Sequence, residues 1–228
     1  ARATERMRLL NRLQQLIGRT YDLAAQPDVA DFVITCPTLA RSLGLPVSAA
    51  ASTEQVLVAD GGETLDLALY LDEDMLARLR AEDPLEALHD GNLGDFWTAL
   101  EGVSHFVFLA WSAAFERQTT RLELELQAEI DKFVLSAMLI ASQFGGRVPA
   151  DLHTWLFDRC GYAEHLDADE RARYGQANRR AARYCRELMH GFLERGSDGA
   201  LMPELRRFYR LSPRRKLRRI ATAADARS

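Results

Sequence analysis

QVLVADGGETLDLALYL, residues 55–71, is the part of this 228-residue chain that predicts β-structure most clearly. Residues 55–59 are mainly apolar, and residues 60–63 carry a pair of glycines that tolerate the positive φ angles of a tight turn. The stretch therefore predicts an antiparallel β-hairpin. Its second arm alternates, and one side of it carries Leu65, Leu67, Leu69 and Leu71. Because a two-stranded hairpin is marginal alone, we expect this leucine face to lie on helices or on a third strand.

The sequence before the hairpin predicts two helices and the third strand. Apolar residues recur at helical spacing from about Thr4 to Ala24, which predicts a first helix. Residues 32–35 form a short β-prone run, and Pro37 bars its continuation as a central strand. Residues 38–43 are expected to form a short helix that ends at Gly44.

Nearly everything after the hairpin predicts helix. Thr120 with Glu123, and Asp167 with Glu170, have the spacing of a capping box at the start of a helix. Gly91 to Gly94 is expected to be a break. The predicted helices cover about 72–80, 95–115, 120–144, 151–157 and 167–195.

The apolar helix at 95–115 has about the length of a membrane span. Glu101, Ser104, His105 and Ser112 interrupt it. An acidic residue at mid-bilayer costs on the order of 3 kcal/mol. We therefore expect a helix buried in a protein core and no membrane span.

These elements predict an α+β fold that is predominantly helical, with an N-terminal antiparallel β-hairpin or small three-stranded sheet packed on a helical bundle. The expected organisation is a single acidic domain over residues 1–205, with a hinge at 145–149, and a basic C-terminal tail over residues 206–228.

Composition places the chain among globular proteins, since 47% of its residues are hydrophobic and 27% are charged. The cysteines are odd in number and far apart, at Cys36, Cys160 and Cys185, which argues against a disulfide framework or a zinc ribbon. The first ten residues lack the apolar stretch of a signal peptide. We therefore expect a cytoplasmic protein.

Lys132 and Lys216 are the only lysines, and so strong a preference for arginine is typical of a GC-rich bacterial genome.

Four residues of two neighbouring predicted helices form the one candidate catalytic or metal site. Glu101 and His105 are four residues apart, and so are Glu125 and Glu129. Each pair therefore shares a helical face. If the two helices pair antiparallel, the four side chains converge. Ferritin-like sites use Glu-x-x-His twice, a pattern that this sequence does not meet. We therefore prefer a buried histidine paired with a carboxylate that fixes helix packing, with no metal and no cofactor, and keep as the alternative an enzyme site between the two helices, with or without a metal.

Common catalytic motifs are absent: the sequence has no P-loop, no dinucleotide-binding glycine pattern, no H-E-x-x-H and no G-x-S-x-G. Cys36 is interpreted as a small buried residue before Pro37 rather than as a nucleophile. His153, His165 and His190 have no ligand spacing.

The tail concentrates positive charge. Eight of the fourteen residues from 206 to 219 are basic. Residues 206–228 carry a formal charge of +8, which leaves −12 for residues 1–205. Ser212 and Pro213 predict an N-cap and a first helical residue. The predicted contact residues are Arg206, Arg207, Phe208, Tyr209, Arg210, Arg214, Arg215, Lys216, Arg218 and Arg219.

This charge pattern, together with the missing catalytic motifs, predicts an interaction protein that is not an enzyme: an accessory or regulatory subunit of a bacterial multi-protein complex. We expect a protein partner or self-association, including docking of the tail on the chain's own acidic body. A nucleic-acid-binding accessory protein is the third interpretation, although a pI near 5.8 argues against it.

Overall fold

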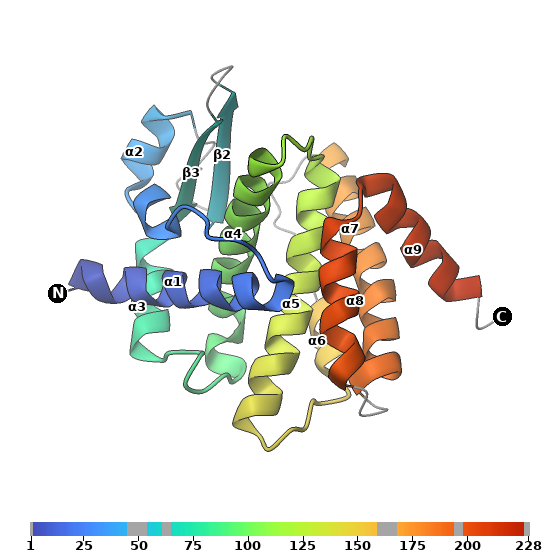
Figure 1. Cartoon of the computed structure of the whole chain (residues 1–228). Helices are drawn as coiled ribbons and strands as arrows, with labels where there is room; N and C mark the ends of the chain where they lie inside the picture. The colour runs from blue at the N-terminus through green and yellow to red at the C-terminus, as the bar shows by residue number, and fades with distance from the viewer. Residues whose placement is uncertain (1, 45–53, 61–64, 159–167, 194–197, 226–228) are drawn as a thin grey trace. The chain divides into compact units, whose positions relative to one another are not determined.

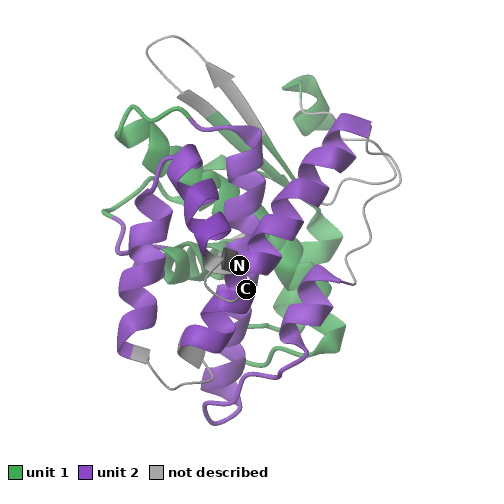
Figure 2. Ribbon diagram, turned by 90° about the vertical axis from the view of Figure 1, so that its right-hand side faces the viewer, with its two compact units in different colours: residues 1–17, 24–118 green, residues 18–23, 119–228 purple. Residues whose placement is uncertain are grey.

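The computed structural model describes residues 2–44, 54–60, 65–158, 168–193 and 198–225 (Figure 1). The chain forms two compact units, coloured separately in Figure 2, and each is described by itself. Unit 1 comprises residues 1–17 and 24–118, and unit 2 comprises residues 18–23 and 119–228. The expected boundary between residues 205 and 206 falls inside a helix of unit 2.

Unit 1 combines helices with a small sheet. Its helices are α1 (Arg2–Tyr21, whose last turn belongs to unit 2), the 3₁₀ turn η1 (Val29–Phe32), α2 (Pro37–Ser42), α3 (Glu73–Ala81) and α4 (Asp90–Ala114). Its strands are β1 (Val33–Ile34), β2 (Glu54–Asp60) and β3 (Leu65–Leu71).

The sheet of the described residues has the order β1-β3-β2. β2 and β3 pair antiparallel, with Val56 opposite Leu69, so the predicted hairpin strands are confirmed. The predicted turn at 61–64 lies outside the described residues. β1 pairs parallel with β3 at the sheet edge, where Val33 lies opposite Leu69. An edge position agrees with Pro37 following shortly after β1. The expected α+β class, predominantly helical with a small sheet, is confirmed.

Two leucines of the predicted leucine face, Leu69 and Leu71, lie at the end of β3 that is buried in unit 1. Leu69 and Leu71 are fully buried, and α4 lies against both β2 and β3. Tyr70 points to the other side of the strand, where it is buried with Ala40 of α2 and Ile34 of β1. Both faces of this end of the strand are therefore covered.

Helix α4 begins earlier than predicted, so the expected break at residues 91–94 is wrong. His89 is the N-cap: its Nδ1 accepts the Gly91 N–H at 3.1 Å. Asn92 Oδ1 accepts the His89 N–H at 2.9 Å. This reciprocal cap satisfies amide groups of the first turn, where glycine is tolerated. Phe96, Phe106 and Phe108 are buried along the helix. No described helix combines the length and the apolar character that crossing a bilayer requires.

Unit 2 is built from helices around α5. They are α5 (Arg121–Gln143), α6 (Leu152–Phe157), α7 (Ala168–Leu188) followed by the π-helical turn η2 (Met189–Leu193), α8 (Asp198–Arg210) and α9 (Pro213–Asp225). α5 and α7 form the main pairing, and α6 and α9 pack on α7. The predicted hinge at 145–149 lies between α5 and α6.

Helix α8 was not predicted, because Gly196, Gly199 and Pro203 are unfavourable for helix. Leu205, Phe208 and Tyr209 are buried on it. We attribute the helix to this burial, since packing of an apolar face supplies most helical stability in proteins.

Candidate functional site

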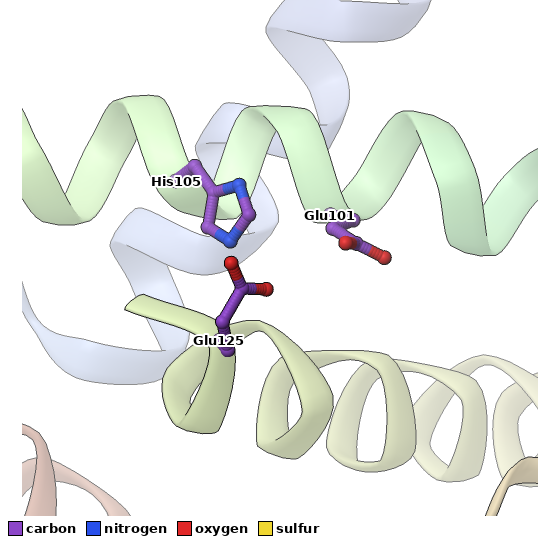
Figure 3. Close-up of side chains that lie close together, drawn as sticks. All are labelled: Glu101, His105 and Glu125. Atoms are coloured by element: carbon purple, nitrogen blue, oxygen red, sulfur yellow. The ribbon is translucent and has the colours of Figure 1, made fainter. Parts of the chain in front are cut away.

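Two of the four predicted site residues lie one turn apart on α4. Figure 3 shows the side chains of Glu101 and His105 on the same side of this helix. A carboxylate oxygen of Glu101 and a ring nitrogen of His105 lie within 4.8 Å of each other. The imidazole is buried, with a side-chain exposure of 9%. The expected helical pair is therefore present in unit 1.

A third residue of this cluster comes from the sheet and was not predicted. Glu54, the first residue of β2, places Oε1 3.6 Å from Nδ1 of His105, and its side chain is only 13% exposed. Sequence spacing cannot reveal this pair, because 51 residues separate the two positions. The alternation of β2 only indicates that Glu54 and Val56 share a face.

The glycine between the two α4 residues determines how closely the sheet approaches. A Cβ on Gly102 would lie 2.8 Å from Leu69 Cδ1 and 2.9 Å from Glu54 Cγ. Side chains do not approach at such distances, so only glycine fits without displacing one of its neighbours. Gly102 therefore permits the carboxylate of Glu54 to lie against α4 beside His105.

The other two predicted residues lie on α5 in unit 2. Glu125, also labelled in Figure 3, is buried on that helix. Glu129 Oε1 accepts a hydrogen bond from Lys132 Nζ at 2.6 Å, one turn along the same helix. The two predicted pairs are thus each present on their own helix.

A polar pocket on the surface of unit 1 involves none of the four predicted residues. It has a volume of about 300 Å³ and is lined mainly by charged residues, namely Arg8, Arg12, Arg80, Asp83 and Glu86, with Leu9 and Leu79. Arg12 lies 2.7 Å from Asp83 and 3.4 Å from Glu86. The acidic residues thus balance part of the positive charge of this pocket.

The basic C-terminal segment, residues 206–225, is folded into unit 2 as α8 and α9. Its only lysine, Lys216, has no exposed surface. Nζ lies 3.2 Å from Oε1 of Glu123, which is 2% exposed, and donates to Gln127 Oε1 at 3.1 Å. The ammonium group also lies 5.5 Å from the ring centroid of Phe208 and 5.7 Å from that of Tyr209. Burial of both charges requires this pairing, because an isolated buried charge is costly.

This ion pair extends into a buried hydrogen-bond network on α5. Gln127 Nε2 donates to Asp131 Oδ1 at 2.9 Å and to Tyr21 Oη at 3.2 Å. Tyr21 donates to Asp131, and its ring stacks on Tyr209 with centroids 4.2 Å apart. Burial, followed by the charge of Asp131, raises the pKa of Tyr21 well above its usual value. The network joins residue 21 to α5 and α8 within unit 2.

Two arginines of α8 hold the carboxyl end of α1. Arg206 donates to the carbonyls of Thr20 and Arg19, both at 3.3 Å. Arg210 donates to the carbonyls of Tyr21 and Asp22, both at 2.8 Å. The last carbonyls of a helix have no partner within it, and a guanidinium there also opposes the negative end of the helix dipole. Both arginines therefore have a structural role.

Further basic residues of the segment pair with acidic ones. Arg219 contacts Glu187 of α7 and Glu204 of α8, each at 2.9 Å. Arg207 contacts Glu204 at 2.7 Å. Glu204 also lies near Tyr184, whose pKa is raised by burial and then by this carboxylate.

Three arginines of α9 differ from the others. Arg214, Arg215 and Arg218 are exposed. Among the described residues, no side-chain hydrogen bond or ion pair is found for any of the three, in contrast with Arg206, Arg207, Arg210, Lys216 and Arg219. Because Lys216 and Ile220 face the interior, Arg214 and Arg218 project from the opposite side of the helix.

The described cysteines lie in opposite environments, and Cys160 lies outside the described residues. Cys36 is exposed, which contradicts the predicted buried position, and the backbone N–H groups of Leu39 and Thr38 lower its pKa. Cys185 is buried, and burial, followed by the charge of Glu129, raises its pKa.

Comparison with known proteins gives no relative: no protein-family model, no curated protein and no solved structure matches this chain.

Proposed function

We propose that the chain is a non-enzymatic interaction protein, an accessory or regulatory subunit of a larger protein complex. Its contact element is the exposed face of α9, formed by Arg214, Arg215 and Arg218, which binds an acidic surface of a protein partner. One observation carries the proposal: these three guanidinium groups are exposed and have no partner among the described residues, whereas the other basic residues of the same segment all contact groups of unit 2.

The geometry of these arginines suits recognition of carboxylates. Residues 214 and 218 are one turn apart, as are 215 and 218, so their guanidinium groups are neighbours along the helix. A guanidinium binds a carboxylate through two parallel hydrogen bonds, which fixes orientation as well as charge. The helix itself is held in unit 2 by Lys216 and Arg219, so the three side chains start from a fixed backbone.

The charge of the chain favours a protein over a nucleic acid as the partner. Unit 1 has eight basic and 17 acidic residues, a formal charge of −9, and unit 2 has 21 basic and 16 acidic residues, a formal charge of +5. A chain that carries −4 overall lacks the general positive charge that is typical of nucleic-acid-binding domains. The three exposed arginines of α9 form a small basic face, which matches a small acidic surface of a protein better than a long phosphate backbone.

The test is a pull-down from nuclease-treated cell lysate with the tagged full-length chain. Deletion of residues 206–228 is unsuitable, because it removes the buried residues Phe208, Tyr209 and Lys216. The variant Arg214→Gln/Arg215→Gln/Arg218→Gln changes the exposed face alone and should lose the recovered partner. The control Arg171→Gln/Arg179→Gln/Arg186→Gln removes the same charge from exposed positions of α7 and should keep it.

Two outcomes contradict the proposal. One is undiminished recovery by the α9 variant. The other is equal loss in both variants, since that result identifies general charge attraction rather than a defined face. Material that is recovered from untreated lysate but not from nuclease-treated lysate assigns the surface to nucleic acid.

A further inference from the structure

We propose that Glu101 and His105 bind a divalent transition-metal ion in unit 1, and that Glu54 positions the imidazole for this role. The proposal is independent of the α9 contact, because it concerns different residues in the other unit. It goes beyond the sequence prediction, which expected no metal and did not include Glu54.

The donor set favours such an ion. A carboxylate oxygen and an imidazole nitrogen are ligands that Zn²⁺, Fe²⁺ and Mn²⁺ share. Atoms bound at about 2.0 to 2.2 Å to one ion lie roughly 3 to 4 Å from each other. A carboxylate oxygen of Glu101 and a ring nitrogen of His105 lie within 4.8 Å of each other, which is close to that separation.

Glu54 has the position of a residue that orients a metal-binding histidine. Its carboxylate faces Nδ1 of His105 at 3.6 Å. A histidine that binds a metal through one ring nitrogen usually donates the other N–H to a carboxylate or a carbonyl. We propose that a shortening of this contact on metal binding lets Nδ1–H donate to Glu54, which leaves the lone pair on Nε2 as the metal ligand.

Burial and local packing hold this arrangement in place. The side chains of His105 and Glu54 are almost completely enclosed. Gly102, between the two ligand residues, leaves the space that the Glu54 side chain fills. Two carboxylates and one imidazole inside a unit of low dielectric constant are also favoured by a divalent cation, which offsets the negative charge of both acids.

Cobalt binding to the full-length protein tests the proposal without any assay of activity. The chelator-treated chain is titrated with Co²⁺ while the visible d–d absorption is followed, and Zn²⁺ is then added in competition. We expect one equivalent of Co²⁺ with visible bands, displaced by Zn²⁺. Glu101→Gln and His105→Gln should each weaken binding more than 100-fold, and Glu54→Gln should weaken it about 10- to 100-fold.

Two variants serve as controls. Glu82 is exposed and lies 3.4 Å from His89, so Glu82→Gln detects adventitious binding at this surface pair and keeps the His89 cap of α4. His153 is buried in unit 2 and bonds to the carbonyl of Ala182. Both controls should bind Co²⁺ as the natural sequence does.

The proposal is overturned if the protein binds no Co²⁺ at 100 µM, if the signal is lost with Glu82→Gln, or if Glu101→Gln and His105→Gln retain it. Circular dichroism establishes that each variant is folded. Glu101→Gln keeps the size of the side chain at a half-buried position. This variant therefore tests metal binding if the His105 variant does not fold.

Discussion

Lys216 illustrates how one residue can have a role opposite to that expected from its neighbours in sequence. It lies within a strongly basic stretch, yet it is completely buried against Glu123, Gln127 and two aromatic rings. Lysine has a flexible apolar stem and a compact charge, which suits a buried position when an acid is present. Some basic residues of this stretch thus stabilise unit 2, and the others face solvent.

Lys216→Met should destabilise unit 2 by about 3 to 5 kcal/mol, because it leaves Glu123 as an uncompensated buried charge. Arg215→Met, the adjacent exposed position, is the matched control and should change stability by less than about 0.5 kcal/mol. The measurement is urea unfolding followed by circular dichroism.

The double variant Lys216→Met/Glu123→Met should recover most of that stability, since a buried ion pair replaced by apolar side chains is often neutral. A loss equal to the sum of the two single variants would show that the two residues do not interact.

Tyr21 predicts a dependence of stability on alkaline pH. Its folded-state pKa lies above the unfolded value of 10.0, through burial and the charge of Asp131. The folded state therefore retains a proton that the unfolded state releases. Titration of this group does not change the free energy of unfolding below pH 10. Above pH 10 the free energy of unfolding falls, by about 1.4 kcal/mol per pH unit for each such tyrosine.

Tyr21→Phe should be less stable at neutral pH, because Asp131 loses a buried hydrogen bond. Its stability should also fall less steeply above pH 10. Thermal unfolding between pH 8 and 11 measures both effects. Equal slopes for the variant and the natural sequence would contradict the assignment.

At the scale of elements, the contact of α4 with the sheet depends on Gly102. Gly102→Ala should destabilise unit 1 by about 1 to 3 kcal/mol, because the added methyl group overlaps Leu69 and Glu54. Gly94→Ala is the control on the same helix: no atom lies within 4 Å of its Cβ position. It should stabilise the helix by up to about 1 kcal/mol. Urea unfolding measures the free energy of unfolding of the two variants. Changes of opposite sign would support the close approach of Leu69 and Glu54 to Gly102.

Elements defined by local signals could be predicted from the sequence. Thr120 caps α5 as expected, accepting the N–H of Glu123, because a cap depends on residues three positions apart. Asp72, the first residue of the predicted helix at 72–80, caps α3 in the same way and accepts the N–H of Met75. The β-hairpin strands follow from the alternation of 65–71. Helix α8 could not be predicted, because its local sequence contains Pro203 and its stability comes from packing.

The candidate site could be predicted only in part, for the same reason. Glu101 and His105 share a helical face, and spacing alone shows it. Glu54 lies beside them because β2 pairs with β3 and because Gly102 has no side chain. Neither cause can be predicted from a local sequence pattern. Likewise, nothing near residue 216 indicates that its partner is Glu123.

For the molecule as a whole, the charge separation at residue 205, −12 against +8, is larger than that between the two units, −9 against +5, because the positive charge of unit 2 comes from its C-terminal residues. Unit 1 is acidic and unit 2 is basic. Within unit 2, most basic residues of the C-terminal segment serve its own folding. The proposed function depends on the remainder, the three exposed arginines of α9.

The most direct test of this division is to measure, on the same variant, the affinity for the recovered protein partner and the free energy of unfolding. For Arg214→Gln/Arg215→Gln/Arg218→Gln, we predict at least a tenfold loss of affinity, and unfolding in urea unchanged within about 1 kcal/mol. Unchanged affinity, or a stability loss as large as that of Lys216→Met, would contradict the assignment of these arginines to partner binding.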